Sequence, residues 1–127
     1  MTRTALKIIN KAMNTLGLEY GFVRYDKKPI VYPYWVGEYQ ETAPTTESGH
    51  SNTTFLLTGF HRGTWEELEQ QKESIANYFN KVSGKTVMAE DGSAVAVFYS
   101  NSLIVPTGDA NLKRIQINLD VHEWSVK

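Results

Sequence analysis

Three histidines and a few neighbouring polar side chains are the residues of this chain best suited to catalytic or metal chemistry. Asp120 and His122 are two positions apart, so on a strand they share one face and could supply two metal ligands, with Asn118 beside them. No motif adds a third ligand, and the solvent face of a strand carries polar residues in any case. His50 and His61 belong to other segments. We therefore expect no metal and no bound cofactor.

The motifs of nucleophilic catalysis and phosphate binding give no better match. There is no Gly-x-Ser-x-Gly turn to expose a serine nucleophile. Gly59 and Gly63 flank a strand end before a helix, but their spacing fits neither the P-loop nor the dinucleotide fingerprint. Glu66 and Glu67 fall in the first turn of that helix, where its dipole favours negative charge. We expect a protein that is not an enzyme.

The bulk composition describes one ordinary domain. A chain of 127 residues can bury a core of its own, so we expect a single domain over residues 1–127. There is no cysteine for a disulfide, and no apolar run is long enough for a signal sequence or membrane span. We expect a soluble protein made in the cytoplasm. A net charge of −1 disfavours a protein dominated by nucleic-acid binding.

The stretch 112–126 is the clearest strand. Its odd positions from Ile115 to Val121 are aliphatic and its even positions from Arg114 to His122 are polar. Such alternation predicts a half-buried strand whose register is fixed, because a slip of one residue would exchange the two faces.

The other elements follow from periodicity and capping signals. An amphipathic helix is predicted over residues 4–16, ended by Gly17. A second helix begins at a Thr64 and Glu67 capping box and ends near residues 83–84. Pro33 places the strand at 30–39 at a sheet edge or a bulge. The remaining strands are predicted over residues 19–25, 54–61, 85–89 and 93–100. The pattern predicts an α+β domain with two layers, in which two helices pack on one face of a mostly antiparallel sheet.

Two stretches favour contacts with other molecules. Residues 41–52 contain no aliphatic side chain larger than alanine, which predicts a long loop that is either functional or disordered. Residues 32–39 are dense in aromatic side chains, which we expect in the core or at an interface.

Charge is distributed unevenly along the chain. Basic side chains outnumber acidic ones six to two before Val31, whereas seven glutamates face two basic side chains between Glu38 and Glu73. Such a dipole could orient copies head to tail, the contact that builds rings. The alternative is that charges on solvated faces segregate by chance.

Three stretches carry a family resemblance: residues 32–39 (YPYWVGEY), 58–65 (TGFHRGTW) and 105–117 (VPTGDANLKRIQI). They resemble small structural proteins of tailed phages and prophages of Gram-positive bacteria, in particular the tail-terminator and tail-completion group. The resemblance implies a two-layer α+β subunit that assembles as a hexameric ring. Such a ring would cap the tail tube, stop its elongation and present a docking surface to the head.

The resemblance also sets the expected partners and place. They are further copies of the chain, the tail tube protein and the head–tail connector, in a virion, with no membrane and no specific nucleic-acid binding although DNA passes through the ring. The alternatives are a head–tail joining (neck) protein, a small metal- or ligand-binding domain and, third, a nucleic-acid-binding module. The residues expected at interfaces are Tyr34, Trp35, Glu38, Tyr39, Glu47, His50, Arg114, Asp120 and His122.

Overall fold

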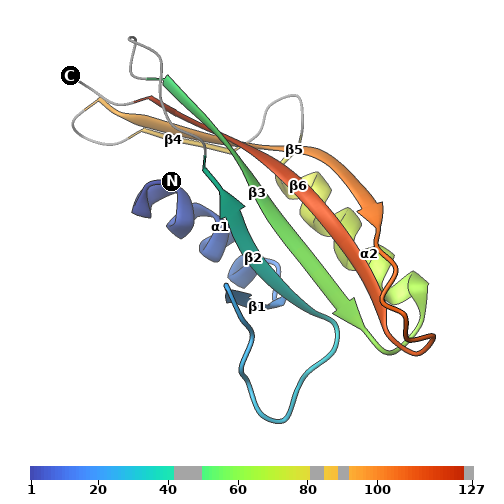
Figure 1. Cartoon of the computed structure of the whole chain (residues 1–127). Coiled ribbons are helices and arrows are strands. Elements are labelled where there is room, and N and C mark those ends of the chain that lie inside the picture. The colour runs from blue at the N-terminus through green and yellow to red at the C-terminus, as the bar shows by residue number, and fades with distance from the viewer. Residues whose placement is uncertain (42–49, 81–84, 89–91, 125–127) are drawn as a thin grey trace.

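The computed structural model describes residues 1–41, 50–80, 85–88 and 92–124. Within these ranges the chain forms two α-helices and one six-stranded sheet (Figure 1). The helices are α1 (Arg3–Thr15) and α2 (Trp65–Tyr78). The strands are β1 (Glu19–Phe22), β2 (Tyr34–Gln40), β3 (His50–His61), β4 (Lys85–Met88), β5 (Ala94–Ile104) and β6 (Lys113–Trp124). The predicted α+β class is confirmed.

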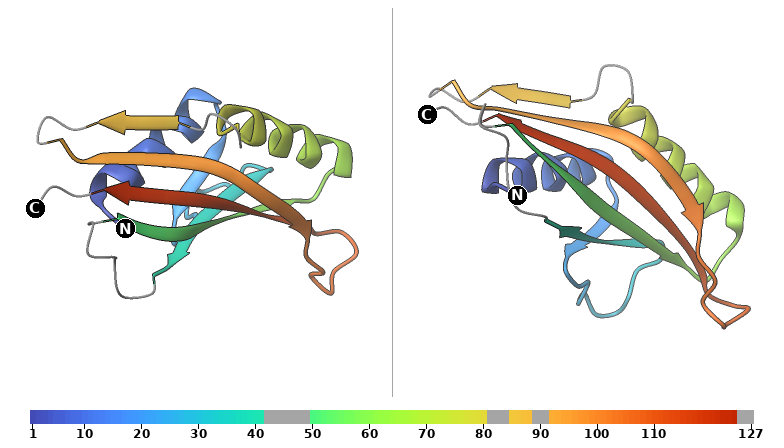
Figure 2. Two further views of the ribbon diagram at one scale, coloured as in Figure 1. Left: turned by 90° about the horizontal axis from the view of Figure 1, so that it is seen from above. Right: turned by 45° about the horizontal axis from the view of Figure 1, so that its top comes forward.

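The strands are ordered β1-β2-β3-β6-β5-β4 across the sheet. β1 runs parallel to β2, and the other neighbouring pairs are antiparallel. The sheet is therefore mixed, and it curls as a half-barrel (Figure 2). The prediction of a mostly antiparallel, two-layer arrangement thus holds only in part.

β6 lies at the centre of this sheet and alternates as predicted. Ile115, Ile117, Leu119 and Val121 have at most 1% of their surface exposed, while the even-numbered residues between them are half-buried. β3 pairs with β6 along its whole length and follows the same alternation, with Phe55 and Leu57 fully buried. One face of the sheet is therefore a continuous apolar surface.

Both helices contribute to the core on that surface. α1 buries Ala5, Ile9, Ala12 and Met13, and α2 buries Leu68 and Ile75; all belong to one cluster with the aliphatic residues of β6. α2 starts with the predicted capping box, in which the Thr64 hydroxyl accepts from the Glu67 N–H and the Glu67 carboxylate accepts from the Thr64 N–H.

Two glycines make room for aromatic rings on the core face. An ideal Cβ on Gly59 would lie 2.7 Å from Cη2 and Cζ3 of Trp35, the residue paired with it across β2 and β3. A Cβ on Gly37 would lie 2.5 Å from Cζ of Phe55. Only a residue without a side chain fits at either position.

The strand predicted at 30–39 begins later and lies further inside the sheet. β2 starts at Tyr34, so Pro33 lies outside it, and β2 has a neighbour on each side rather than forming an edge. The edge is β1, which ends at Phe22 instead of Tyr25. Val23 ends it with a positive φ of 71°, a conformation that a continuing strand does not adopt.

The start of β3 and the end of β5 differ from the predicted strand bounds because of strand pairing. β3 begins at His50, since residues 50–53 pair with β6, and this shortens the predicted loop at 41–52. β5 continues beyond its predicted end at residue 100 to Ile104, through a register shift between Tyr99 and Asn101. The predicted helix end at residues 83–84 and loop residues 42–49 lie outside the described residues.

Candidate functional site

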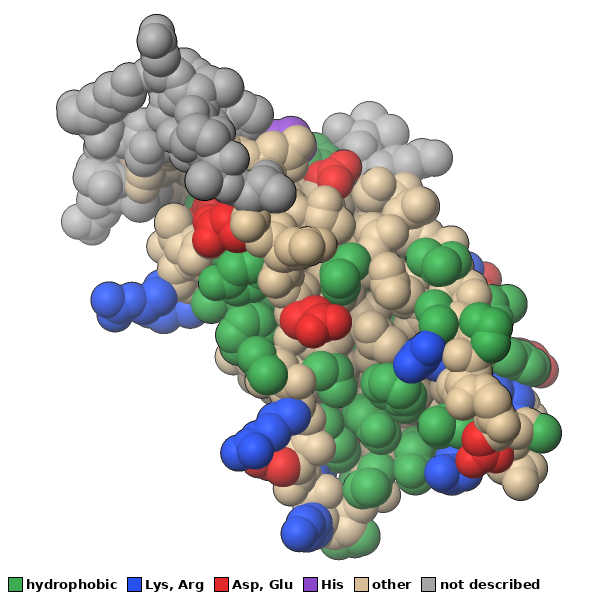
Figure 3. Space-filling view, viewed as in Figure 1, with side chains coloured by type: hydrophobic (Ala, Val, Ile, Leu, Met, Phe, Trp, Pro, Cys, Tyr) green, Lys and Arg blue, Asp and Glu red, His purple; other side chains and the backbone are tan. Residues whose placement is uncertain are grey.

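The sheet face opposite the core, here called the open face, is the most distinctive surface of the molecule. It is formed by the even-numbered residues of β2, β3 and β6 and by their partners on β5. No described helix lies over it, because both helices pack on the core face (Figures 1 and 2). Figure 3 looks onto this face and shows hydrophobic side chains gathered over its lower half with few charges among them.

A line of stacked side chains, here called the aromatic row, crosses that half of the open face. Tyr34 on β2 is directly opposite Phe60 on β3, which is directly opposite Arg114 on β6. The Tyr34 and Phe60 ring centroids are 5.2 Å apart, and the Arg114 guanidinium lies 6.0 Å from the Phe60 centroid. Tyr25 extends the row with its ring stacked 4.6 Å from Tyr34. These separations are those of favourable aromatic and cation–π contacts.

Polar contacts hold Arg114 and the side chains beside the aromatic row in place. Arg114 Nη2 donates to the Pro106 carbonyl oxygen at 3.1 Å. Arg62 Nε donates to the Tyr32 hydroxyl at 3.3 Å, and its Nη1 lies 3.3 Å from Asp109 Oδ2. The Asn111 backbone N–H and then Arg62 lower the pKa of the Asp109 carboxyl. Partial burial raises the pKa of the Tyr34 hydroxyl, so Tyr34 is neutral at physiological pH.

The middle of the open face carries amide side chains on β5 and β6, with the carboxylates of Glu38 and Asp120 beside them. Gln116 Nε2 donates to Asn118 Oδ1 at 3.0 Å, and Asn118 Nδ2 donates to Asn101 Oδ1 at 2.8 Å. At the far end the His122 ring lies between Phe98 and Trp124, with centroids 5.7 and 5.9 Å away. The open face therefore has an aromatic patch at each end and hydrogen-bonding amides between them.

Five of the residues predicted at interfaces share the open face: Tyr34, Glu38, Arg114, Asp120 and His122. They come from β2 and β6, which are separated by β3, and no spacing in the sequence relates the two strands. The structure brings Tyr34 and Arg114 to either side of Phe60.

Two predicted interface residues lie on the other face. Trp35 has no exposed surface: its ring packs against Gly59 and its Nε1 donates to Gln71 Oε1 at 2.8 Å. Its prediction as an interface residue is wrong, because strand alternation sends it into the core beside Tyr34. Tyr39 also points to the core face and stacks on Phe22 with centroids 6.1 Å apart. Glu47 and the side chain of His50 lie outside the described residues.

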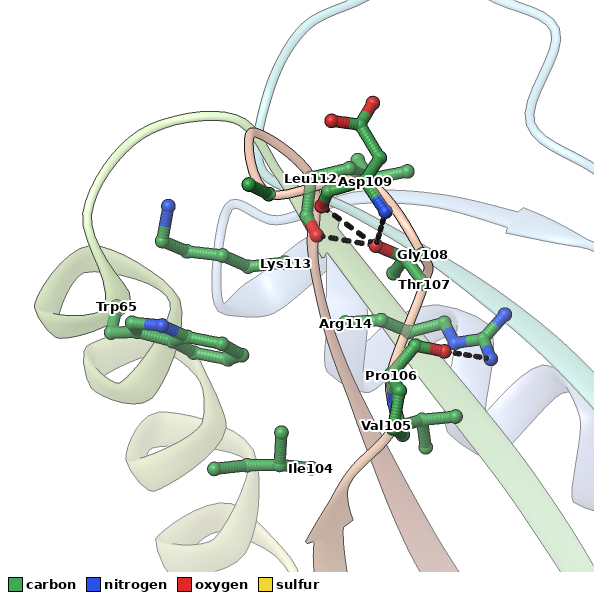
Figure 4. A pocket seen from close by; sticks show the side chains of 11 residues that line it. Trp65, Ile104, Val105, Pro106, Thr107, Gly108, Asp109, Leu112, Lys113 and Arg114 are labelled. Atoms are coloured by element: carbon green, nitrogen blue, oxygen red, sulfur yellow. Dashed lines mark hydrogen bonds between the residues drawn. The ribbon is translucent and has the colours of Figure 1, made fainter.

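A groove of about 330 Å³ lies beyond the lower end of β6 (Figure 4). Its walls are Trp65 at the start of α2, the 105–112 segment and the first residues of β6. Lys113 Nζ lies 5.9 Å from the centre of the Trp65 ring, and the Thr107 hydroxyl holds the segment by donating to the Leu112 carbonyl at 2.8 Å. Its polar lining side chains are those of Thr107, Asp109, Lys113 and Arg114, and the rest of the lining is largely apolar.

The side chains that could do chemistry are not brought together. His61 is buried on the core face, with Nε2 3.6 Å from Glu67 Oε1, whereas His122 is on the open face. Their positions along the paired strands β3 and β6 are about 30 Å apart at 3.3 Å per residue. Within the described ranges no three His, Cys, Asp or Glu side chains cluster as metal ligands. No helix in the same ranges is long and apolar enough to cross a membrane.

Sequence reasoning missed two members of the aromatic row. Phe60 could have been found from the parity of β3, because Phe55 and Leu57 point to the core and Phe60 must point away. Tyr25 lies between strands and no periodic signal marks it.

The chain matches no protein-family model and no curated protein sequence. The fold and the open face still define a kind of protein: a small α+β domain that presents an aromatic sheet surface. Aromatic and arginine side chains on an uncovered face are typical of protein–protein contacts.

Proposed function

We propose that the chain is a structural phage protein, a tail terminator that assembles as a hexameric ring. The ring caps the tail tube, stops its elongation and forms the surface to which the head connector docks. The protein is made in the cytoplasm of the bacterial host, ends in the virion and has no catalytic role. Each subunit is taken as a two-layer domain whose helices cover one face of a mostly antiparallel sheet, so that the other face is available for docking.

The open face is the observation that carries this proposal. It presents the aromatic row and the Phe98, His122 and Trp124 cluster without a covering layer among the described elements. Stacked aromatic and arginine side chains bury a large area at little cost in side-chain entropy. The amides between the two clusters can exchange hydrogen bonds with a partner backbone. A surface of this kind supports a subunit whose work is to bind other proteins.

In the proposed assembly the open face meets the last ring of the tail tube. Arg114 can add a charge-assisted hydrogen bond to a partner carboxylate, because its guanidinium is already fixed against Phe60 and Pro106 and loses little freedom on binding. Glu38 and Asp120 form no ion pair with the described residues and can accept from a basic partner.

The first test is the solution mass, measured by light scattering over a concentration series, with negative-stain images of any large species. We expect a species of six copies that images as a ring. The second test mixes the protein with growing tubes of a phage tail tube protein. We expect tubes that stop at the added ring, so that their mean length falls as the ring concentration rises.

Variants connect that test to the open face. Arg114→Glu reverses the charge at the end of the aromatic row and should abolish tube capping; circular dichroism first establishes that the variant is folded, because it also loses the contacts of Arg114 with Phe60 and Pro106. Lys28→Ala, in an exposed loop, is the matched control and should cap as the wild type does. If Arg114→Glu caps tubes as the wild type does, the open face is not the surface that binds the tube. A protein that binds the head connector but never the tube would instead be a neck protein.

A further inference from the structure

α1 carries a stripe of three cations on its outer side, here called the basic stripe. Arg3, Lys7 and Lys11 are spaced four residues apart, so they line up along one face of the helix. All three are exposed, whereas Ala5 and Ile9 between them are fully buried. The sequence of α1 contains no acidic residue.

α2 carries the opposite charge on its outer side. Glu66, Glu69 and Glu73 follow each other at spacings of three and four residues and line one shallow groove with Gln70. We call this the acidic stripe. Leu68 faces the core from the same helix, so the stripe points away from the sheet. Lys72 lies 2.9 Å from Glu69 and neutralises only one of the three carboxylates.

Other charges of the chain are used within the subunit. Lys27 lies 3.0 Å from Glu19, and Glu67 accepts the Thr64 N–H in the capping box. The three cations of the basic stripe form no ion pair within the described part of the chain, and neither do Glu66 and Glu73. The uneven charge distribution of the sequence is therefore concentrated, in the fold, on two helix faces, of which only the acidic one has a counter-charge of its own, Lys72.

The two stripes are similar in length and opposite in charge. Arg3 and Lys11 are about 12 Å apart along the helix axis, and Glu66 and Glu73 about 10.5 Å, at 1.5 Å per residue. α1 and α2 both pack on the core face of the sheet and lie apart from each other on it in Figures 1 and 2. The partner that fits the basic stripe of one copy is thus the acidic stripe of another copy.

We propose that neighbouring copies of this chain bind through these two helices, with the basic stripe of one subunit against the acidic stripe of the next. The contact joins different surfaces of identical chains, which is the arrangement that closes into a ring. It rests on the proposed function, for which it supplies the contact between subunits, while the open face remains free for the tube. Because the paired charges are near solvent, added salt weakens the contact.

Charge reversal tests the contact directly. One variant carries Arg3→Glu, Lys7→Glu and Lys11→Glu; a second carries Glu66→Lys, Glu69→Lys and Glu73→Lys. The control carries Arg24→Glu and Lys28→Glu, which reverses one arginine and one lysine in an exposed loop and leaves the ion pair of Lys27 with Glu19 intact. Circular dichroism and thermal unfolding establish that each is folded. Light scattering at low and high salt then gives the concentration of half-assembly.

We expect each of the two stripe variants to need at least ten times the wild-type concentration for half-assembly, and the loop control to differ by less than threefold. An equimolar mixture of the two stripe variants should assemble as the wild type does, since each then meets its opposite charge. If a reversed variant does not fold, Lys7→Gln with Lys11→Gln and Glu66→Gln with Glu73→Gln replace the two variants, and each pair should weaken assembly about tenfold.

Assembly of the separate stripe variants at the wild-type concentration, or no recovery in the mixture, would overturn the contact. So would a wild-type chain that stays monomeric at low salt. Tube capping is measured separately. If the charge-reversed variants still form rings and these rings cap tubes, the terminator role stands and only the proposed contact between subunits is refuted. If the protein associates in the charge-dependent way but does not cap tubes, the proposed contact stands and the terminator role is refuted.

Discussion

Gly59 lies directly beneath the Trp35 ring, so adding a single methyl group there should have a large effect. The alanine Cβ would lie 2.7 Å from two atoms of the ring, and reaching an ordinary contact of 3.4 Å requires a shift of about 0.7 Å. Trp35 has no exposed surface and its Nε1 is held by Gln71 at 2.8 Å, so the ring cannot move without losing that hydrogen bond.

The expected loss of stability combines two terms. Overpacking a core costs about 1–3 kcal/mol, and a broken buried hydrogen bond adds about 1 kcal/mol. Gly59→Ala should therefore lower the free energy of unfolding by about 2–4 kcal/mol, which corresponds to roughly 8–16 °C in melting temperature at about 4 °C per kcal/mol. Chemical denaturation and differential scanning calorimetry measure both quantities. Thr58→Ala, one residue away on the open face, is the control and should cost less than about 1 kcal/mol.

Measuring Gly59→Ala again in a Trp35→Phe protein separates the clash with the ring from the general cost of alanine in a strand. Trp35→Phe removes the benzo ring to which all three contacted atoms belong. Gly59→Ala should then cost at least about 1 kcal/mol less than in the wild type, as expected for coupled neighbours. Equal losses in the two backgrounds, or a loss in the wild type below about 0.5 kcal/mol, would refute the proposed clash.

Three further predictions concern single positions. Ile117→Asp buries an unpaired carboxylate at a fully buried site of β6 and should cost more than about 4 kcal/mol, leaving no cooperative unfolding transition. Val23→Asn should raise the free energy of unfolding by about 0.5–1 kcal/mol, because asparagine tolerates the positive φ of 71° that strains valine; Val23→Thr, also β-branched, should give no gain. Hydrogen bonds from the Thr64 N–H and hydroxyl lower the pKa of the Glu67 carboxyl below 4.5. The stability that this carboxylate contributes is therefore present above the unfolded pKa and is lost as pH falls through the folded value. Melting curves from pH 6 to pH 3 should fall more steeply for the wild type than for Glu67→Gln, and parallel curves would contradict the capping role.

The features predicted correctly from sequence are those written in local patterns. The alternation around Ile117 fixed both faces of β6, and the Thr64 and Glu67 pair located the start of α2, because each signal spans only a few residues. The parallel pairing of β1 and the early start of β3 at His50 depend instead on partners far away in the chain. No local pattern encodes them.

The same distinction applies to the candidate site. Arg114, Asp120 and His122 share a face by strand parity alone, which sequence provides. That Tyr34 joins them follows from the strand order β2-β3-β6, which a single sequence does not reveal. Trp35 was placed beside Tyr34 at an interface although adjacent strand residues point to opposite faces, and the space left by Gly59 decides which of the two is buried.

β6 joins two parts of the sheet that share no other ladder among the described strands: β1, β2 and β3 on one side, and β4 and β5 on the other. During synthesis, which proceeds from the N-terminus, this central strand leaves the ribosome after all the others. Until residue 124 has emerged, β3 and β5 each expose an unpaired edge of more than ten residues. The sheet is therefore completed only when its last-made strand is available, and its long-range pairings make this step slow. Until then, the newly made chain passes through a state whose open edges can pair with other chains before β6 closes them.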